Sequence, residues 1–567
     1  MPCTLYCTGS NSHGQLATAS TDDFHSFFQL ILPDTSSRPL DLACGANHTL
    51  LLVEDGSTRK RRLHGAGSNA RGQLYPASPA VDTLLSFQPL DVLPPGATSH
   101  GGFEPIAVAA CWETSFVVFR PGPPSKQDDL LVAFGANDWG ELGYGSAGGS
   151  TESAETSVRF DHLKESVEEV VRVEKIRAGP RHVVALLSFS RPSPPSNTAT
   201  TSSLPPAPPS LCRRLLVGWG ASRHGQLGPS SSSFPLPKAT PLPTAVTLPP
   251  NYDASEILDF AVGKDHSAVV LSAKDQGEGG QRVWLFGTRR LGQLGPFPPE
   301  VPSAEDIAAR RRKATDVAAT SNILSASSLL EGLSPSPAGS PPIPVASYEI
   351  SCIGCTWNGT YVVLSPSPDF SPSPSSSSQP DVLLSFGSHT HGQLGCGAPS
   401  TISGASHAPA PARPALEFSS SAGQPRLVAL PSLLSSNGDN APLRISHLAC
   451  GSEHVLVVFR HRLAASISTS SLASTAETEG GGEVWGWGWN EHGNLTLSDR
   501  AERRGEKVEA GEEAGEAGVG LEDVWEPRRV WSSRAGNEVG RGKVEGIWAG
   551  MATSWVSVEE EEEEEGE

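Results

Sequence analysis

An eight-residue pattern that occurs seven times constrains the fold of this chain more strongly than any other feature of its sequence. The pattern is a glycine, four mostly polar residues, a second glycine, a glutamine, glutamate or asparagine, and a leucine. Repetition at intervals of tens of residues is typical of propellers and solenoids, in which each copy is one structural unit. The sequence therefore predicts seven units, whose patterns occupy Gly9–Leu16, Gly67–Leu74, Gly135–Leu142, Gly220–Leu227, Gly287–Leu294, Gly387–Leu394 and Gly488–Leu495.

Short apolar runs lead into these patterns and end at their first glycine, as in Leu130–Gly135 and Val382–Gly387. Such runs, bounded by glycine, indicate buried strands that run into turns. The second glycine of each copy is expected to adopt a positive φ, which glycine tolerates best. These structural glycines are Gly14, Gly72, Gly140, Gly225, Gly292, Gly392 and Gly493.

A companion motif precedes most of the lead-in runs and predicts another strand. It is clearest in Ala43–Val53, and similar stretches occur at Arg177–Leu187, Ala261–Leu271 and Ala449–Phe459. Three further copies lack the histidine: Ala109–Phe119, Gly354–Leu364 and Trp548–Val558. A symmetric ring of metal ligands would not tolerate these three gaps. We therefore interpret the histidines as structural, each bonding within its own unit and burying its ring: His48, His182, His266 and His454.

The spacing of the repeats indicates propeller blades separated by inserts. Neighbouring central glycines are at least 58 residues apart, as between Gly14 and Gly72, whereas about 50 residues suffice for a four-stranded blade. The excess falls in segments rich in Pro, Ser, Gly or charge, which we expect to be disordered loops. One of them, Ser303–Ala319, predicts a short surface helix capped by Ser303. The inserts lie at about 190–210, 229–250, 298–345, 365–380, 398–440, 461–482 and 499–540.

The two ends of the chain carry complementary strands. Cys3–Gly9 is a lead-in run without a preceding companion, and Thr553–Val558 is a companion without a following lead-in. Unpaired strand edges expose backbone hydrogen-bonding groups. We therefore expect these two segments to pair antiparallel, so that one blade is built from both termini. The domain prediction is one propeller over 1–558, followed by an acidic disordered tail at 559–567.

Charge and cysteine content narrow the possible partners and location. The formal net charge is −20 and the chain carries no basic tail, so direct binding to nucleic acid, which needs clustered cations, is not expected. Nine cysteines without an apolar leader indicate reduced thiols. No apolar run reaches the ~18 residues of a membrane span. We expect a cytoplasmic protein, with the nucleus as a further location.

Several other motifs could carry chemistry, and each also has a structural interpretation. Cys352–Cys355 has the spacing of metal ligands but no second pair, and Gly143–Gly148 matches a nucleotide-binding glycine pattern without its βαβ context. The basic tetrads Arg59–Arg62 and Arg310–Lys313 are either import signals or acid-binding patches, or simply solvated surface. Four histidines of the eight-residue pattern are either surface turn residues or partner contacts: His13, His224, His391 and His492. No catalytic, cofactor-binding or metal-ligating residue is assigned.

The alternation of the two motifs resembles the regulator of chromosome condensation (RCC1) repeat family over essentially the whole chain. The resemblance implies an all-β fold, a seven-bladed β-propeller, whose members include exchange factors, ubiquitin-ligase modules and adaptors. A finer similarity is to the stand-alone fungal members, the alpha-tubulin suppressor or killer-toxin-insensitivity group, because the first strand begins at Cys3. That similarity implies an adaptor that pairs with a small zinc-binding electron-carrier protein in diphthamide synthesis and in wobble-uridine modification of tRNA.

Two functions follow as hypotheses. The first is a non-catalytic adaptor without a cofactor, present as a monomer or heterodimer. The alternative is a guanine-nucleotide exchange factor for a Ran-like small GTPase, which would need no acid–base residues.

Overall fold

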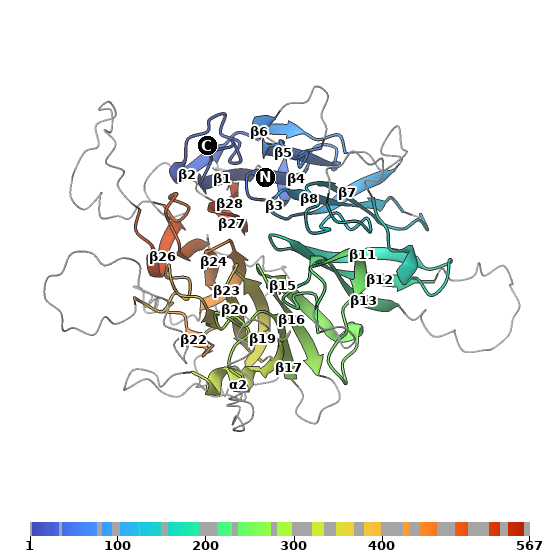
Figure 1. Cartoon of the computed structure of the whole chain (residues 1–567). Helices are drawn as coiled ribbons and strands as arrows, with labels where there is room; N and C mark the ends of the chain where they lie inside the picture. The colour runs from blue at the N-terminus through green and yellow to red at the C-terminus, as the bar shows by residue number, and fades with distance from the viewer. Residues whose placement is uncertain are drawn as a thin grey trace, which may run out of the picture. The chain divides into compact units, whose positions relative to one another are not determined.

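The computed structural model shows an all-β fold with the arrangement of a seven-bladed β-propeller, as the repeats predict (Figure 1). The described strands form seven four-stranded sheets, and every printed strand pair within them is antiparallel. No helix in the described parts of the chain is long and apolar enough to cross a bilayer. The residues that the structure describes are 3–32, 37–75, 82–92, 102–123, 125–148, 157–191, 212–229, 236–273, 280–297, 320–333, 348–367, 379–398, 423–430, 443–461, 482–496, 521–532 and 542–560.

The chain divides into two compact units, and the smaller one, here called the three-blade unit, comprises residues 13–21 and 36–258. Its strands follow one another in sequence order within each blade. The first blade contains β3 (Arg38–Cys44), β4 (His48–Glu54), β5 (Arg61–Ser68) and β6 (Thr83–Pro89). The second contains β7 (Phe103–Ala110), β8 (Thr114–Pro121), β9 (Leu130–Gly135) and β10 (Ser157–Val158). The third contains β11 (Val170–Ala178), β12 (His182–Ser190), β13 (Arg213–Ala221) and β14 (Ala239–Ala245).

The second unit, here called the four-blade unit, comprises residues 1–12, 22–35 and 259–567. One blade contains β15 (Ile257–Val262, whose first two residues belong to the other unit), β16 (His266–Ala273), β17 (Gly280–Gly287) and β18 (Thr320–Ser325), and helix α2 (Ala326–Glu331) follows it. The next contains β19 (Tyr348–Cys355), β20 (Gly359–Pro366), β21 (Val382–Gly387) and β22 (Arg426–Leu427). Another contains β23 (Leu443–Cys450), β24 (His454–His461), β25 (Glu483–Gly488) and β26 (Val524–Ser532).

The remaining blade of this unit is built from both ends of the chain, in the order β2 (Phe24–Leu30), β1 (Cys3–Gly9), β28 (Thr553–Glu560), β27 (Gly542–Ala549). β1 pairs antiparallel with β28, from Gly9 opposite Thr553 to Thr4 opposite Val558. The predicted pairing of Cys3–Gly9 with Thr553–Val558 is therefore confirmed. All seven residues of β1 are buried, because β1 has a strand on each side.

The hydrophobic core lies between adjacent blades within each unit. In the three-blade unit one cluster joins side chains of β8 and β9 to side chains of β11, β12 and β13, and Phe116 meets Trp219 edge-on at 6.1 Å. In the four-blade unit a cluster includes Tyr361, Trp487 and Val556 from three blades. Blades pack face to face in this way because the apolar residues of their middle strands project from both faces.

The fourth strands lie inside ranges that the sequence predicted to be inserts. β14 lies in 229–250, β18 in 298–345, β22 in 398–440 and β26 in 499–540, so for these residues the loop prediction is wrong. The reason is that an outer strand has one free edge and one solvated face, and therefore tolerates proline and polar residues. β14, with the sequence ATPLPTA, buries only one of its seven residues.

The predicted acidic tail and the predicted surface helix have the following outcomes. Glu559 and Glu560 do not belong to a disordered tail, because they extend β28, where Glu559 pairs with Cys3. The rest of the tail, most of the other insert residues and the predicted helix at Ser303–Ala319 lie outside the described residues.

Candidate interaction site at the turn edge of the blades

The seven repeat turns share one backbone conformation. Each central glycine has a φ between +73° and +82°. A side chain would also lack space there: a Cβ on Gly140 would lie 2.7 Å from Pro241, and one on Gly392 would lie 2.6 Å from the carbonyl oxygen of Val524. We call the end of each blade that carries these turns and the companion turns its turn edge.

Polar residues of the eight-residue pattern are used within their own turn. The Leu74 N–H donates to Asn69 Oδ1 at 2.8 Å, and the Arg71 N–H donates to Gln73 Oε1 at 2.8 Å. The same glutamine bond occurs at His224 N with Gln226 and at His391 N with Gln393. These amide side chains stabilise the turn and are not available to a ligand.

The four companion histidines are fully buried, but their bonds differ from the prediction. His48 Nε2 lies 2.8 Å from Ser115 Oγ, His266 Nε2 lies 3.1 Å from Thr360 Oγ1, and His454 Nε2 lies 3.1 Å from Ser554 Oγ. Each hydroxyl belongs to the next blade. The expectation that each histidine bonds within its own blade is therefore wrong, because the ring points across the space between two blades.

The hydroxyl groups connect the two sequence motifs of one blade. Ser115 Oγ donates to the Gln73 carbonyl oxygen at 2.6 Å, and Thr360 Oγ1 donates to that of Gln293 at 2.8 Å. Since the hydroxyl proton is used in this way, the hydroxyl must accept from the histidine Nε2–H, which fixes the tautomer. The companion histidine and the pattern glutamine of one blade thus meet at a single hydroxyl of its neighbour.

Burial also prevents these histidines from acting as bases or cations. It lowers the pKa of His48 to about 3 and the pKa of both His266 and His454 to about 4. A neutral ring whose Nε2–H is already donated has a structural role. Three blades lack the histidine, and in two of them a tryptophan of the next blade binds the equivalent carbonyl: Trp219 Nε1 donates to Glu141 at 2.7 Å and Trp487 Nε1 donates to Gln393 at 2.8 Å.

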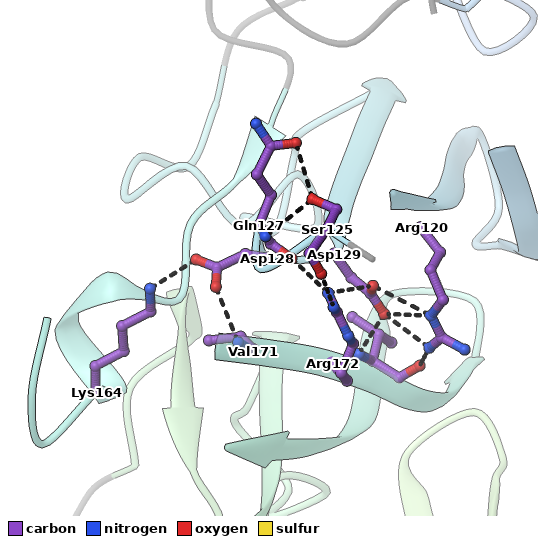
Figure 2. A network of polar contacts seen from close by, with 9 residues as sticks. Arg120, Ser125, Gln127, Asp128, Asp129, Lys164, Val171 and Arg172 are labelled. Carbon is purple, nitrogen blue, oxygen red and sulfur yellow. Dashed lines mark hydrogen bonds and ion pairs between the residues drawn. The ribbon is translucent and has the colours of Figure 1, made fainter. Parts of the chain in front are cut away.

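A second set of links between blades, which the sequence analysis missed, begins at acidic residues just before the lead-in strands (Figure 2). The Asp129 side chain is fully buried and accepts from Arg120 Nη2 at 2.8 Å, Arg172 Nη1 at 3.1 Å and the Val173 N–H at 3.0 Å. Asp128 accepts from Lys164 Nζ at 2.6 Å. The signal in the sequence is an acid that directly precedes the apolar run.

Asp381 occupies the equivalent place before β21. It accepts from Arg444 Nη1 at 2.6 Å and from the Ile445 N–H at 2.8 Å. These carboxylates are matched by arginine and by backbone N–H groups, which offsets the cost of burying their charge. They join blades and are not part of a binding site.

The other predicted motifs also have structural partners. His391 Nδ1 lies 3.0 Å from Asp523, and His492 Nδ1 lies 2.7 Å from Asp23, whose hydrogen bond raises the pKa of His492. His224 Nε2 lies 3.3 Å from Arg223 Nη2. The turns that carry these histidines belong to the turn edge.

The structure places the cysteine pair on one strand and the first basic tetrad at the start of another. Cys352 and Cys355 lie on β19, and burial raises the pKa of Cys355 to about 12. No group of three His, Cys, Asp or Glu side chains within the described part of the chain could hold a metal ion. Arg59 and Lys60 precede β5, and Arg61 and Arg62 begin it. Arg59 pairs with Glu54 at 2.8 Å, and Arg62 pairs with Asp55 at 3.1 Å. The tetrad Arg310–Lys313 lies outside the described residues.

The turn edge of the three-blade unit carries exposed aromatic and cationic side chains. Trp112 is 41% exposed. Trp139 is half-buried, and its ring lies 4.9 Å from the Arg181 guanidinium and 4.5 Å from Lys238 Nζ. Exposed aromatic and cationic side chains on a rigid backbone are typical of protein interfaces. This surface is the candidate functional site.

Comparison with known proteins agrees with the fold. The family model of the regulator of chromosome condensation (RCC1) repeat matches residues 40–73. The ultraviolet-B receptor UVR8 of Arabidopsis thaliana is 25% identical over 287 residues, which are 51% of this chain and 49% of that receptor. The match thus spans about half the length of the receptor.

Two solved structures extend the comparison to nearly the whole chain. Human WBSCR16 is similar with a TM-score of 0.54 at 14% identity, over 98% of this chain and all of that one. Prp20p of Saccharomyces cerevisiae, described together with its binding properties to Gsp1p and histones, has a TM-score of 0.38 at 14% identity, over 100% of this chain and 93% of that one. At these identities the likeness of human WBSCR16 shows the fold alone.

Proposed function

Because the RCC1 repeat model matches residues 40–73, we propose that the chain is a member of that repeat family and a non-catalytic interaction protein, an adaptor that holds a protein partner on the turn edge of its blades. The observation that carries this proposal is the exposure of Trp112, Arg181 and Lys238 beside turns whose other polar groups are used internally. A rigid backbone that displays these side chains binds without losing much conformational entropy.

The finer form of the proposal concerns the partner. The similarity to the stand-alone fungal members of the family supports a small zinc-binding electron-carrier protein as the partner, with roles in tRNA wobble-uridine modification and diphthamide synthesis. In this arrangement the partner would supply the redox chemistry and the propeller would supply the docking surface.

The competing function is nucleotide exchange on a Ran-like GTPase, and two purified systems separate the possibilities. In the first, the full chain is mixed with the small zinc-binding carrier, and complex formation is measured by titration calorimetry and light scattering. In the second, release of a labelled GDP from the GTPase is followed with and without the chain. We expect a one-to-one complex in the first and no acceleration in the second. Failure to form the complex, together with faster GDP release by orders of magnitude, would replace the adaptor by an exchange factor.

A further inference from the structure

A continuous row of exposed side chains crosses two blades on the turn edge of the three-blade unit. The Trp112 N–H donates to the Pro180 carbonyl oxygen at 2.9 Å, which places Trp112 beside Arg181. Arg181 and Lys238 both contact the ring of Trp139. The Ser222 N–H donates to the Lys238 carbonyl oxygen at 3.2 Å, which places the next residue, Arg223, at the end of the row.

The three cations of this row are not neutralised by neighbouring carboxylates. Arg181, Arg223 and Lys238 are exposed, and no ion pair involves them in the described structure. The nearby acids are engaged elsewhere. Asp138 and Glu113 lie 3.1 Å and 3.8 Å from the guanidinium of a different arginine, Arg71.

One buried acid beneath the row offsets part of the positive charge. Glu141 accepts the Trp139 N–H at 2.7 Å, and burial raises its pKa to about 7. The row still presents three exposed cations without an ion pair among the described residues, in a chain whose net charge is −20.

The row also offers apolar surface in a fixed position. The two cation–π contacts restrain Arg181 and Lys238 over Trp139. Leu242 of β14 is 45% exposed, and the bond from the Gly145 N–H to the Pro241 carbonyl oxygen at 2.9 Å holds this strand against the turn. Tryptophan and arginine are the side chains that most often dominate binding energy at protein interfaces.

We propose that this row docks an acidic segment of a protein partner that carries an apolar or aromatic side chain between its acids. The proposal deepens and rests on the adaptor function. An acidic segment is repelled by most of this acidic chain and attracted to the three exposed cations of the row, which favours a defined orientation. The apolar side chain packs on the exposed apolar surface of the row, which Trp112 and Leu242 supply. A protein segment is favoured over nucleic acid because the row has only three cations, and phosphate binding depends on many.

The test uses the full chain and a short fluorescein-labelled peptide in which glutamates and aspartates flank a central phenylalanine. A matched peptide has glutamine and asparagine at the acidic positions, and a labelled single-stranded DNA of equal charge is the third probe. The variant R181E/K238E reverses two charges of the row. Lys126→Glu is the control, because Lys126 is an exposed cation of the same unit at the opposite end of β8.

We expect anisotropy titrations to show binding of the acidic peptide that weakens with salt and that falls at least about tenfold in R181E/K238E. Lys126→Glu should bind like the parent. Equal binding by both variants, equal binding of the amide peptide, or tighter binding of the DNA would overturn the proposal.

The test of this docking surface and the test of the adaptor function can fail independently. A chain that forms the carrier complex equally well with R181E/K238E keeps its adaptor role and loses this docking surface. A chain that binds the acidic peptide through Arg181 and Lys238 but forms no carrier complex keeps the surface and loses the proposed partner. Circular dichroism of the variants confirms that each remains folded.

Discussion

The hydroxyl group of Ser115 provides the sharpest test of how the blades are joined. Ser115 is fully buried, accepts from His48 Nε2–H and donates to the Gln73 carbonyl oxygen. Changing Ser115 to Ala removes one oxygen and leaves two buried polar groups without this partner. An unsatisfied buried group costs about 1–3 kcal/mol. We therefore expect the free energy of unfolding to fall by about 3 kcal/mol, taking the lower half of that range for each group.

The measurement is equilibrium unfolding in urea, followed by tryptophan fluorescence, since Trp219 lies in the adjoining core. Ser115→Thr is the matched control, because threonine supplies the same hydroxyl at the equivalent position 360. It should be more stable than Ser115→Ala, because it keeps both hydrogen bonds of the hydroxyl. A second control, Ser86→Ala, removes a hydroxyl that accepts only from the exposed Gln88 and should be nearly silent. If Ser115→Ala unfolds within about 0.5 kcal/mol of the parent, the hydroxyl link contributes nothing and the interpretation is wrong.

Three further predictions test other parts of the structure. The pKa of His48, His266 and His454 in the folded chain lies near 3 to 4, below the ordinary 6.5, so the unfolded chain binds more protons. The free energy of unfolding should therefore fall as the pH drops from 6.5 towards 4, by up to ~1.4 kcal/mol per histidine and pH unit. Urea titrations at stepped pH measure this, and a flat profile would contradict it. Gly392→Val should lower the melting temperature clearly, because φ is +77° and the added Cβ would meet Val524. Gly122→Ala is the control and should leave the melting temperature unchanged, because a Cβ there makes only ordinary contacts. Equal melting temperatures of the two variants would refute the turn assignment. Leu5→Ala in the buried β1 should cost about 2–5 kcal/mol and the 91% exposed Ile31→Ala less than about 0.5; similar losses would argue against the blade built from both termini.

The sequence predicted what is local to one repeat. The apolar runs and their glycines identified the two middle strands of every blade, and the unpaired runs at the ends predicted the contact between β1 and β28. It did not predict the outer strands, because a strand such as β14 needs little apolar surface and its prolines resemble those of a loop. Nor did it predict that His48 bonds to Ser115, since the pattern of one repeat does not show which blade its ring faces.

The sequence does carry a signal for the tryptophan contacts between blades, and the structure explains its meaning. Trp219 and Trp487 directly precede the first glycine of their patterns, and the preceding blade in both cases has no companion histidine. In both arrangements the next blade supplies a donor to a backbone carbonyl buried between two blades: a hydroxyl that the histidine also contacts, or the indole N–H of the tryptophan. The companion motif is degraded in three blades, and in two of them the tryptophan of the next blade keeps the contact between blades.

The candidate site was hard to predict because its residues do not belong to the repeat pattern. The residues that define the repeat are used by the fold: the glycines set the turn, the glutamines bond to their own turn, and the histidines bond to the next blade. What remains for binding are the positions that the repeat leaves unspecified, such as Trp112, Arg181 and Lys238. These positions differ from blade to blade, so one face of a regular scaffold can carry an irregular pattern of charge and aromatic surface. The repeat therefore determines where a partner can bind, and the residues between its fixed positions determine which partner binds there.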